Sequence, residues 1–373
     1  MDARRFVKKE PLLIISALLA AVTLLFVPLD TVASYDYDRI IRTILTLFFF
    51  LLVVEGLKEC KALDWLAHET LKNVGSSVTL CVMLVLLPFF SAMLFSNDVS
   101  LLTFVPLAMA VLAQAGMKER IPVVIVLQTV AANIGSSLAP FGNPHNLYMF
   151  NLMEVYGFTV LEYELALVPL VVVGTAAFLA MSMLVPRKEI SVEKEEVRIT
   201  DTRKLAVIMA MFVLAIATVF GAVPLLVTLA VMVAVFLVIM PRMFLRLDYG
   251  ILMVFFFLFV FANGMTSIPS LYSSMSDLMD SQPLLTTVLV SQFTTNVSAT
   301  LLLQPFTSDW AAVLVGADIG GFGTPIASMA AVITLRLYLL REDRDMKRYF
   351  KTFFIINAVM LAVLIPVCLL IRL

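Results

Sequence analysis

The residues best suited to chemistry lie in one polar stretch of an otherwise apolar chain. The stretch from Leu127 to Met149 reads LQTVAANIGSSLAPFGNPHNLYM, and apolar runs flank it on both sides. Its Gly and Pro residues break helices, and its Asn and Ser side chains offer hydrogen-bonding groups. A helix interrupted at membrane depth leaves backbone N–H and C=O groups unpaired, which only a protein interior or a watery cavity tolerates. Such a break is a sequence pointer to the ligand site of a membrane transporter.

A second interruption and two asparagine segments complete the pattern. The stretch from Gly316 to Ser328 reads GADIGGFGTPIAS, and the polar triplets SND and TTN begin at Ser96 and Thr294 within apolar runs. The chain has 14 glycines, and six of them fall in the two interruptions. Glycine is therefore concentrated where helices would break.

We expect the two triplets and the two interruptions to meet in one ligand site. Hard cations such as Na⁺ prefer oxygen ligands, which unwound backbone carbonyls and Asn, Ser and Thr side chains would supply. Half-helix N-termini carry free N–H groups and suit an anionic group. No Lys or Arg lies in these segments, so anion binding would depend on dipoles, amides and bound cations.

The candidate site residues come from both halves of the chain. The predicted binding residues are Ser96, Asn97, Asp98, Asn133, Gly135, Ser136, Ser137, Gly142, Asn143, Pro144, His145, Asn146, Thr294, Thr295, Asn296, Asp318, Gly320, Gly321, Thr324 and Pro325. The predicted Na⁺ ligands among them are Ser96, Asn97, Gly135, Thr295, Asn296 and Gly320. For the asparagines, the alternative is a role as polar contacts between helices.

Three of these residues are ionisable, namely Asp98, His145 and Asp318. An acid at bilayer depth costs about 2.5–3.5 kcal/mol on insertion scales, which suggests a function. They could carry coupling protons, because His titrates near neutral pH. The structural alternatives are that Asp98 caps a helix starting at Val99, and that His145 and Asn146 cap a half-helix or hydrogen-bond its loop.

The composition indicates a polytopic membrane protein. The chain is 61% hydrophobic and 14% charged, whereas soluble domains are about 45–50% apolar and about 25% charged. A net charge of −1 gives no argument for nucleic acid, and the three cysteines lack metal-ligand spacing. The run from Pro11 to Leu29 is long for a signal peptide, so we expect a retained first span. Motifs such as H-E-x-x-H, G-x-S-x-G and Walker A are absent, so we expect no enzyme and no ATP site in this chain.

The two halves of the sequence repeat each other. SNDVSLLTFVP, which starts at Ser96, aligns without gaps with TNVSATLLLQP, which starts at Thr295. NIGSSLAP from Asn133 aligns in the same way with DIGGFGTP from Asp318. We therefore predict an all-α membrane protein of two repeats, each with a re-entrant hairpin and a discontinuous transmembrane helix.

The domain boundaries follow from this repeat. The segments are an N-terminal repeat at 1–186 (hairpin about 74–115, broken helix about 121–156), a cytoplasmic linker and connecting span at 187–221, and a C-terminal repeat at 222–373 (hairpin about 283–306, broken helix about 310–335).

The positions of Lys and Arg give the expected orientation. Basic residues mark cytoplasmic loops, and they gather in 1–10, 57–72, 118–120, 187–204, 241–248 and 336–351. The segments 30–38 and 265–282 then lie outside, the N-terminus lies inside, and the two hairpins enter from opposite sides. This is an inverted-topology repeat, although two full spans in place of the first hairpin also satisfy the charges. We expect a bacterial or archaeal cytoplasmic membrane.

At these residues the sequence resembles the ion transporter superfamily, which includes divalent-anion/sodium symporters, citrate transporters, arsenite-pump membrane subunits and sodium/proton antiporters. SND at 96–98 and TTN at 294–296 are similar to its Ser-Asn-Thr hairpin tips, and ANIGSSLAPFGNPHN is similar to its first Gly/Pro loop. The resemblance implies elevator-type transport by a homodimer, with Na⁺ and substrate carboxylate at the tips and loops. The chain departs from the pattern at Asp98 and Asp318, and it is most similar to the uncharacterised bacterial anion-transporter-like branch.

The expected function is secondary active transport of a small anion, a carboxylate or an inorganic oxyanion, coupled to Na⁺ or H⁺. The expected partners are a small anion or cation as substrate, the lipid bilayer and a second copy of the chain, with no cofactor beyond the coupling ion. The main alternative is a sodium/proton antiporter of the same fold, using Asp98 and Asp318 without an organic substrate. A passive channel and a separate ATPase subunit are further alternatives.

Overall fold

The structure is a computed structural model in which the described chain is helical. It describes residues 11–71, 74–184, 187–189 and 197–372. In these ranges the only β-structure is an isolated bridge between Ser76 and Glu189. Eight helical segments among the described residues are long and apolar enough to cross a bilayer. The chain is therefore an all-α, multi-pass integral membrane protein, and this part of the sequence prediction is confirmed.

The helices of the described chain fall into two runs with a similar order of elements. The first run contains α2 (Pro11–Leu24), α3 (Leu29–Ala33), α4 (Tyr37–Glu59), α5 (Ala62–Leu71), α6 (Ser77–Phe95), α7 (Asn97–Gln114), η1 (Lys118–Arg120), α8 (Ile121–Ser137), α9 (Pro144–Phe150), α10 (Met153–Tyr156) and α11 (Val160–Met183). The second run contains α12 (Thr202–Val219), α13 (Leu225–Ile239), η2 (Pro241–Leu245), α14 (Tyr249–Thr266), α15 (Pro269–Ser281), α16 (Pro283–Ser291), α17 (Asn296–Leu303), η3 (Gln304–Phe306), α18 (Trp310–Gly320), α19 (Met329–Leu339) and α20 (Met346–Arg372).

Both predicted hairpins and both predicted breaks coincide with ends of helices. Helices α6 and α7 form the first hairpin and α16 and α17 the second, while α8 and α18 each stop before a short irregular segment. Helices α6 and α7 are each long enough to cross a bilayer, so their lengths are compatible with both a re-entrant hairpin and two full spans. The predicted first span is shorter than expected. Helix α2 stops at Leu24, and Pro28 precedes the first residue of the short helix α3.

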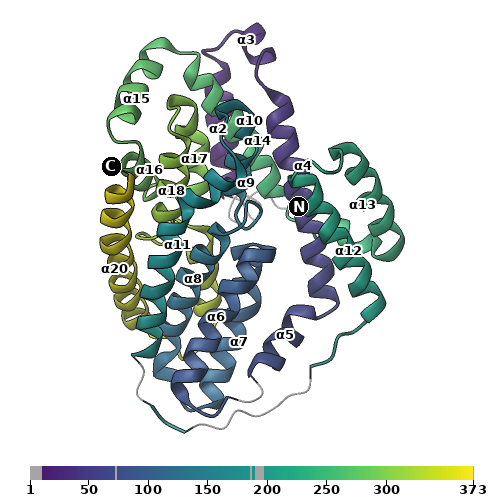
Figure 1. The fold of residues 1–373 in the computed structure, drawn as a ribbon, viewed down its shortest axis with the longest axis vertical. Coiled ribbons are helices and arrows are strands. Elements are labelled where there is room, and N and C mark those ends of the chain that lie inside the picture. The colour runs from purple at the N-terminus through teal and green to yellow at the C-terminus, as the bar shows by residue number, and fades with distance from the viewer. Residues whose placement is uncertain (1–10, 72–73, 185–186, 190–196, 373) are drawn as a thin grey trace.

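The two hairpins approach each other from opposite ends of the molecule. Helices α6, α7 and α8 pack together, as do α16, α17 and α18. The first set occupies the lower half of Figure 1 and the second set the upper half, and α9 packs against α17 and α18 beside the second set. Helices α4, α12 and α13 lie along one side and α20 along the other. The ends of both hairpins therefore lie inside the molecule.

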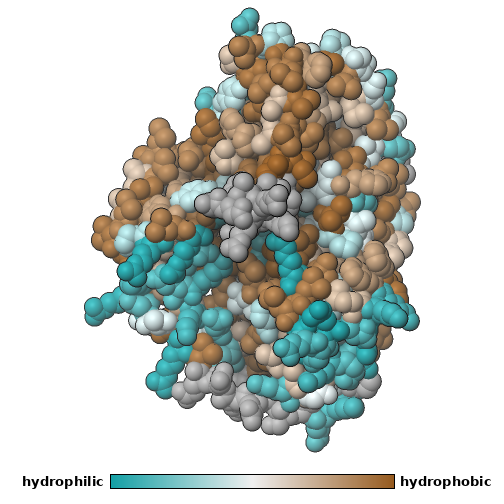
Figure 2. Space-filling view, turned by 180° about the vertical axis from the view of Figure 1, so that it is seen from behind, coloured by the Kyte–Doolittle hydropathy of each residue, from teal (hydrophilic) through white to brown (hydrophobic). Residues whose placement is uncertain are grey.

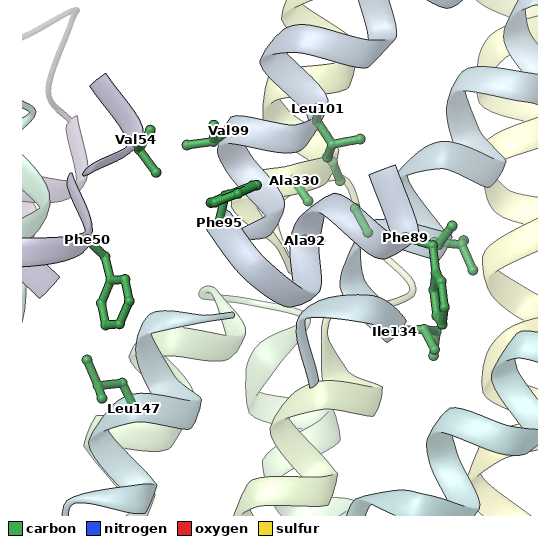
Figure 3. Close-up of a cluster of buried hydrophobic side chains, with 14 of the residues drawn as sticks. Phe50, Val54, Phe89, Ala92, Phe95, Val99, Leu101, Ile134, Leu147 and Ala330 are labelled. Carbon is green, nitrogen blue, oxygen red and sulfur yellow. The ribbon is translucent and has the colours of Figure 1, made fainter. Parts of the chain in front are cut away.

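Apolar packing fixes the first hairpin on one face and leaves it looser on the other. Figure 3 shows Phe89 of α6 against Ile134 of α8, and both side chains are buried. Close to the hairpin tip, Val99 points toward Val54 of α4, with a cavity lined by both residues. The hairpin is thus held by the broken helix α8 more than by α4.

Hydrophilic side chains are unevenly distributed over the surface. In Figure 2 they gather over the lower half of the molecule, while the upper part is mainly hydrophobic. In the described chain, the lower end carries η1 with Lys118 and Arg120, which the sequence assigned to the cytoplasmic side. A large apolar surface is expected of a chain whose solvent is lipid.

Gly135 provides a test of the close approach between α6 and α8. A Cβ at this position would lie 2.1 Å from the Phe89 carbonyl oxygen. We expect Gly135→Ala to lower the stability of the folded protein by about 1–3 kcal/mol, because two backbones must separate. Thermal unfolding in detergent measures the effect, and Gly75→Ala is the control because nothing lies within 4 Å of its Cβ position. Equal melting of the Gly135 variant and the wild type would contradict this packing.

Candidate functional site

The first hairpin tip is tied to both interrupted helices. It turns at Ser96, whose φ of 90° lies in a region that non-glycine residues rarely adopt. The next residue, Asn97, begins α7 and is buried. Its Nδ2 donates to Asn133 Oδ1 at 3.0 Å, and Ser328 Oγ donates to the same oxygen at 3.3 Å. Because Asn133 lies in the last turns of α8 and Ser328 precedes α19, one amide oxygen joins elements of both halves.

The second tip reaches the same place from the other half. Asn296 begins α17, and its backbone N–H donates to the Ala327 carbonyl oxygen at 2.8 Å. Thr295 caps the helix by accepting from the Ser298 N–H at 3.1 Å. A Cβ at Gly321 would lie 3.1 Å from Asn296 Nδ2 and 3.6 Å from Asn133 Nδ2. Gly321 therefore lets the two asparagines, one from each half, come close together.

One glutamine closes the second break. Gln292 Nε2 donates to the carbonyl oxygens of Gly320 and Phe322, each at 3.0 Å. Its Oε1 accepts from the Thr324 N–H at 3.0 Å, and Thr324 Oγ1 donates to the Gln292 carbonyl at 2.8 Å. The side chain thus satisfies three backbone groups at the point where the helix is interrupted.

The first break is closed by its own backbone. Gly142 comes so near to α8 that a Cβ there would lie 2.3 Å from the Ser136 carbonyl oxygen. Its N–H donates to the Ala139 carbonyl at 3.0 Å. The hydroxyls of Ser136 and Ser137 donate to the Asn133 carbonyl at 3.0 and 3.1 Å. These predicted site residues are buried, and their hydrogen bonds shape the break.

A buried pair of ionisable side chains links the two interrupted helices. His145, in the first turn of α9, lies with Nε2 3.1 Å from Oδ1 of Asp318 in α18. The side chains are 0% and 2% exposed, so the pair is shielded from solvent. Its neighbours Asn143 and Asn146 are also buried. The sequence singled out these residues but gave no reason to pair His145 with Asp318.

A cavity of about 460 Å³ opens beside both tips. Ser96 and Thr295 reach it from the tips, and Pro144 and Met329 reach it from the first residues after the breaks. Helices α4 and α14 form the facing wall. The charged lining residues are three acids and three bases, namely Glu55, Asp98, Asp248, Lys58, Arg246 and Arg336. The cavity therefore gives the tips a path to one side of the molecule, with both signs of charge along it.

Asp98 does not have the capping role that the sequence offered as an alternative. Helix α7 begins at Asn97, so Asp98 lies inside the helix, and no side chain makes a cap hydrogen bond there. Its Oδ1 is buried without a hydrogen-bond partner among the described residues, and Asp98 lines the cavity. His145 and Asn146 do not cap the half-helix, because α9 begins at Pro144 and Asn143 occupies the cap position. The other part of that alternative, that they hydrogen-bond the loop, has no support in their described side-chain contacts, since His145 contacts Asp318.

The remaining predicted residues have structural contacts or lie apart. Gly320 packs against α16, since a Cβ there would lie 2.5 Å from Ser291 Oγ. Thr294 donates to the carbonyls of Val290 and Thr295 in its own segment. Pro325 is partly exposed. Among the described contacts, Thr294 and Pro325 do not join the network around Asn133.

Comparisons with known proteins identify the family of the chain. The family model described as "Citrate transporter" matches residues 6–335. The "Uncharacterized transporter MJ0456" of Methanocaldococcus jannaschii is 31% identical over 79% of this chain and 80% of its own length. The "Inner membrane protein YbiR" of Escherichia coli strain K12 is 25% identical over 84% of this chain and 82% of its own length.

The chain belongs to the citrate transporter family. It is thus a membrane transporter of the ion transporter superfamily, as the residues at both tips and the first loop indicated. The matched region contains both hairpins and the start of every half-helix at the site.

Two residues of the site in this citrate transporter family member, Ser328 and Gln292, were not predicted from the sequence. Ser328 occupies the position equivalent to Asn143, so extending the repeat alignment three residues beyond Pro325 would have found it. Gln292 has no such signal, because its counterpart in the first hairpin, Met93, is apolar. Its role is visible only when the break is folded against α16.

Gln292 gives a direct test of how the second break is closed. We expect Gln292→Ala to lower stability by about 2–4 kcal/mol, since it leaves buried backbone groups without partners. Thermal unfolding of the purified protein measures the loss. The matched control is Gln114→Ala, whose side chain is exposed at the end of α7. If both variants melt alike, the break does not depend on the glutamine.

Proposed function

We infer that the protein is a secondary active transporter that moves a small anion coupled to Na⁺ or H⁺. One observation carries this proposal: Asn97, at the first hairpin tip, is hydrogen-bonded to Asn133 at the end of an interrupted helix, and Asn296, at the second tip, lies on the other side of Gly321 from Asn133. Amide oxygens and unwound carbonyls suit a monovalent cation, and amide N–H groups suit an anion. A small carboxylate or inorganic oxyanion fits both kinds of group at once.

The shape around the tips supports elevator-type alternating access. The 460 Å³ cavity separates the tips from α4 and α14, whereas the tips are hydrogen-bonded to the interrupted helices. We therefore propose that hairpins and broken helices move together against α4 and α14. The two hairpins, which meet from opposite ends in Figure 1, would be the re-entrant elements of an inverted repeat.

Charge in the cavity supports access for an anion. Arg336 in α19 lines the cavity, is exposed, and has no ion pair among the described residues. Lys58 and Arg246 are paired with Glu55 and Glu59, respectively. Arg336 would attract anions locally at the mouth, while Asp98 and Asp248 give the same cavity negative charge as well. On the positive-inside rule this mouth faces the cytoplasm, with the N-terminus inside.

The superfamily resemblance also bears on the assembly and the location of the protein. From the superfamily resemblance we propose a homodimer in a bacterial or archaeal cytoplasmic membrane. Energy would come from an ion gradient, and a separate ATPase subunit is not needed for the proposed mechanism.

A sodium/proton antiporter is the second candidate, favoured by the buried acids. Asp318 lies in the tip region and Asp98 lines the cavity, and either could exchange a proton for Na⁺ without an organic substrate. Sodium flux into proteoliposomes in the absence of any added anion separates the candidates, because a symporter would not move sodium alone.

The tip asparagines test the proposal. We expect Asn97→Ala and Asn296→Ala each to lower ion-driven uptake of the anion at least about tenfold, because each removes an amide from the tip. The Thr295 cap of α17 remains in the Asn296 variant, although that variant loses the bond from the Val297 N–H to the Asn296 amide. The measurement is uptake of radiolabelled small carboxylates and oxyanions by proteoliposomes under a Na⁺ or H⁺ gradient.

The matched control is Asn263→Ala, because the Asn263 amide donates to the Phe259 carbonyl of its own helix α14. This variant should retain uptake, and all variants should elute as folded protein. Full uptake by either tip variant would mean that the tips are not the binding site.

A further inference from the structure

Two adjoining cavities lie between the start of α4, the end of α9 and the turn from α12 to α13. They measure about 280 and 270 Å³, and Arg42, Asn151, Val219 and Gly221 line both of them. A Cβ at Gly221 would have nothing within 4 Å, so space is open beside this turn. The first cavity reaches the segment 30–38, which the positions of Lys and Arg assign to the outer side. These outer cavities share no lining residue with the cavity beside the hairpin tips.

Four charged residues at the start of α4 line the first outer cavity, and two of them are paired. Arg39 lies 2.6 Å from Asp36, so these two charges offset each other. Asp38 and Arg42 are exposed and stand one helical turn apart. They make no ion pair with each other or with any other described residue. The cavity therefore offers a ligand one carboxylate and one guanidinium.

An amide donor stands beside the guanidinium. Asn151 follows the last residue of α9, and its Nδ2 donates to Thr43 Oγ1 at 2.9 Å. This bond uses one of the two N–H groups of the amide and holds the side chain against α4. Asn151 and Arg42 line the same two cavities. The fork of a guanidinium, with an amide N–H next to it, suits the oxygens of a phosphate.

The rim of the outer cavities is apolar. Phe220, Val155 and Val160 line the first cavity and are exposed. Leu226, which follows the lining residue Leu225 in α13, is exposed as well. In a chain whose solvent is lipid, exposed apolar side chains contact acyl chains. A ligand that matches both the charges and the rim has a polar head inside the cavity and an apolar body outside it.

We propose that the outer cavities bind the headgroup of a phospholipid that carries both a phosphate and a primary ammonium group. The phosphate lies on Arg42 and Asn151, the ammonium lies on Asp38, and the acyl chains run along Phe220 and the exposed side of α13. A free inorganic anion has no group for Asp38 and none for the apolar rim. The proposal is independent of the transported substrate, because these cavities are separate from the hairpin tips.

Thermal unfolding of the delipidated protein in detergent tests the proposal. We expect added phosphatidylethanolamine to raise the melting temperature, because a ligand of the folded state stabilises it by mass action. Phosphatidylcholine has a methylated amine that donates no N–H, and phosphatidylglycerol has no amine. Each should need at least about tenfold more lipid for the same rise, since a charged hydrogen bond is lost. Equal effects of the three lipids would overturn the proposal.

Variants of the two exposed residues assign the parts of the headgroup. Arg42→Gln should weaken the response to phosphatidylethanolamine at least about tenfold, because the phosphate loses its charged partner. Asp38→Asn should remove the preference for phosphatidylethanolamine over phosphatidylglycerol. The matched control is Arg242→Gln, an exposed arginine of η2 outside these cavities, which should respond as the wild type does. An unchanged response of Arg42→Gln, or an unchanged preference in Asp38→Asn, would contradict the site.

Soluble compounds separate a lipid from a free ligand with the same charged groups. Phosphoethanolamine and inorganic phosphate replace the lipids in the same unfolding assay. We expect neither to raise the melting temperature at the concentration at which the lipid does, because neither has acyl chains for the apolar rim. A rise with phosphoethanolamine equal to that with the lipid would show a site for a free ligand and overturn the lipid assignment.

Discussion

The backbone groups left unpaired at the two helix breaks are the constraint on which the structure depends. In a bilayer no water is available to them, so each must find a partner inside the protein. Gln292 supplies the partners at the second break, and a close turn through Gly142 supplies them at the first. The Asn133 side chain then links the first hairpin tip to the second break. The breaks are therefore satisfied within each half, and the Asn133 side chain joins one half to the other.

The same constraint explains why the binding groups sit where they do. The buried side-chain atoms without partners in the described chain include those of His145, Asn146, Asp318 and Asp98, which the sequence singled out as candidate site residues. Burying such atoms unpaired lowers stability, which supports the proposal that a ligand binds near the tips and breaks. Ser96 adds to this cost, because a non-glycine residue at a φ of 90° loses about 1–3 kcal/mol. Strain at the tip is tolerated because neighbouring helices hold it in place.

Sequence could predict the elements of the site better than its contacts. Polar windows in an apolar chain located both tips and both breaks, since membrane-spanning helices have little other reason to contain Asn, Gly and Pro. Pairing of His145 with Asp318 was not predictable, because 173 residues separate them and no repeat relates them. The role of Gln292 was not predictable for a similar reason, because its three backbone partners come within hydrogen-bonding distance only when the break has folded against α16. The wrong capping role of Asp98 came from placing the start of α7 two residues late.

The central claim is that tips and breaks from both halves form one site for a cation and an anion. The most direct measurement is the melting temperature of the purified protein in Na⁺, Li⁺ or choline, with a panel of small carboxylates and oxyanions. A ligand of the folded state raises this temperature by mass action. The account predicts a rise with Na⁺ or Li⁺, a further rise with one anion only when the cation is present, and loss of both rises when either tip asparagine is replaced. Melting that is indifferent to every cation and anion, or a rise that survives replacement of both asparagines, would contradict it.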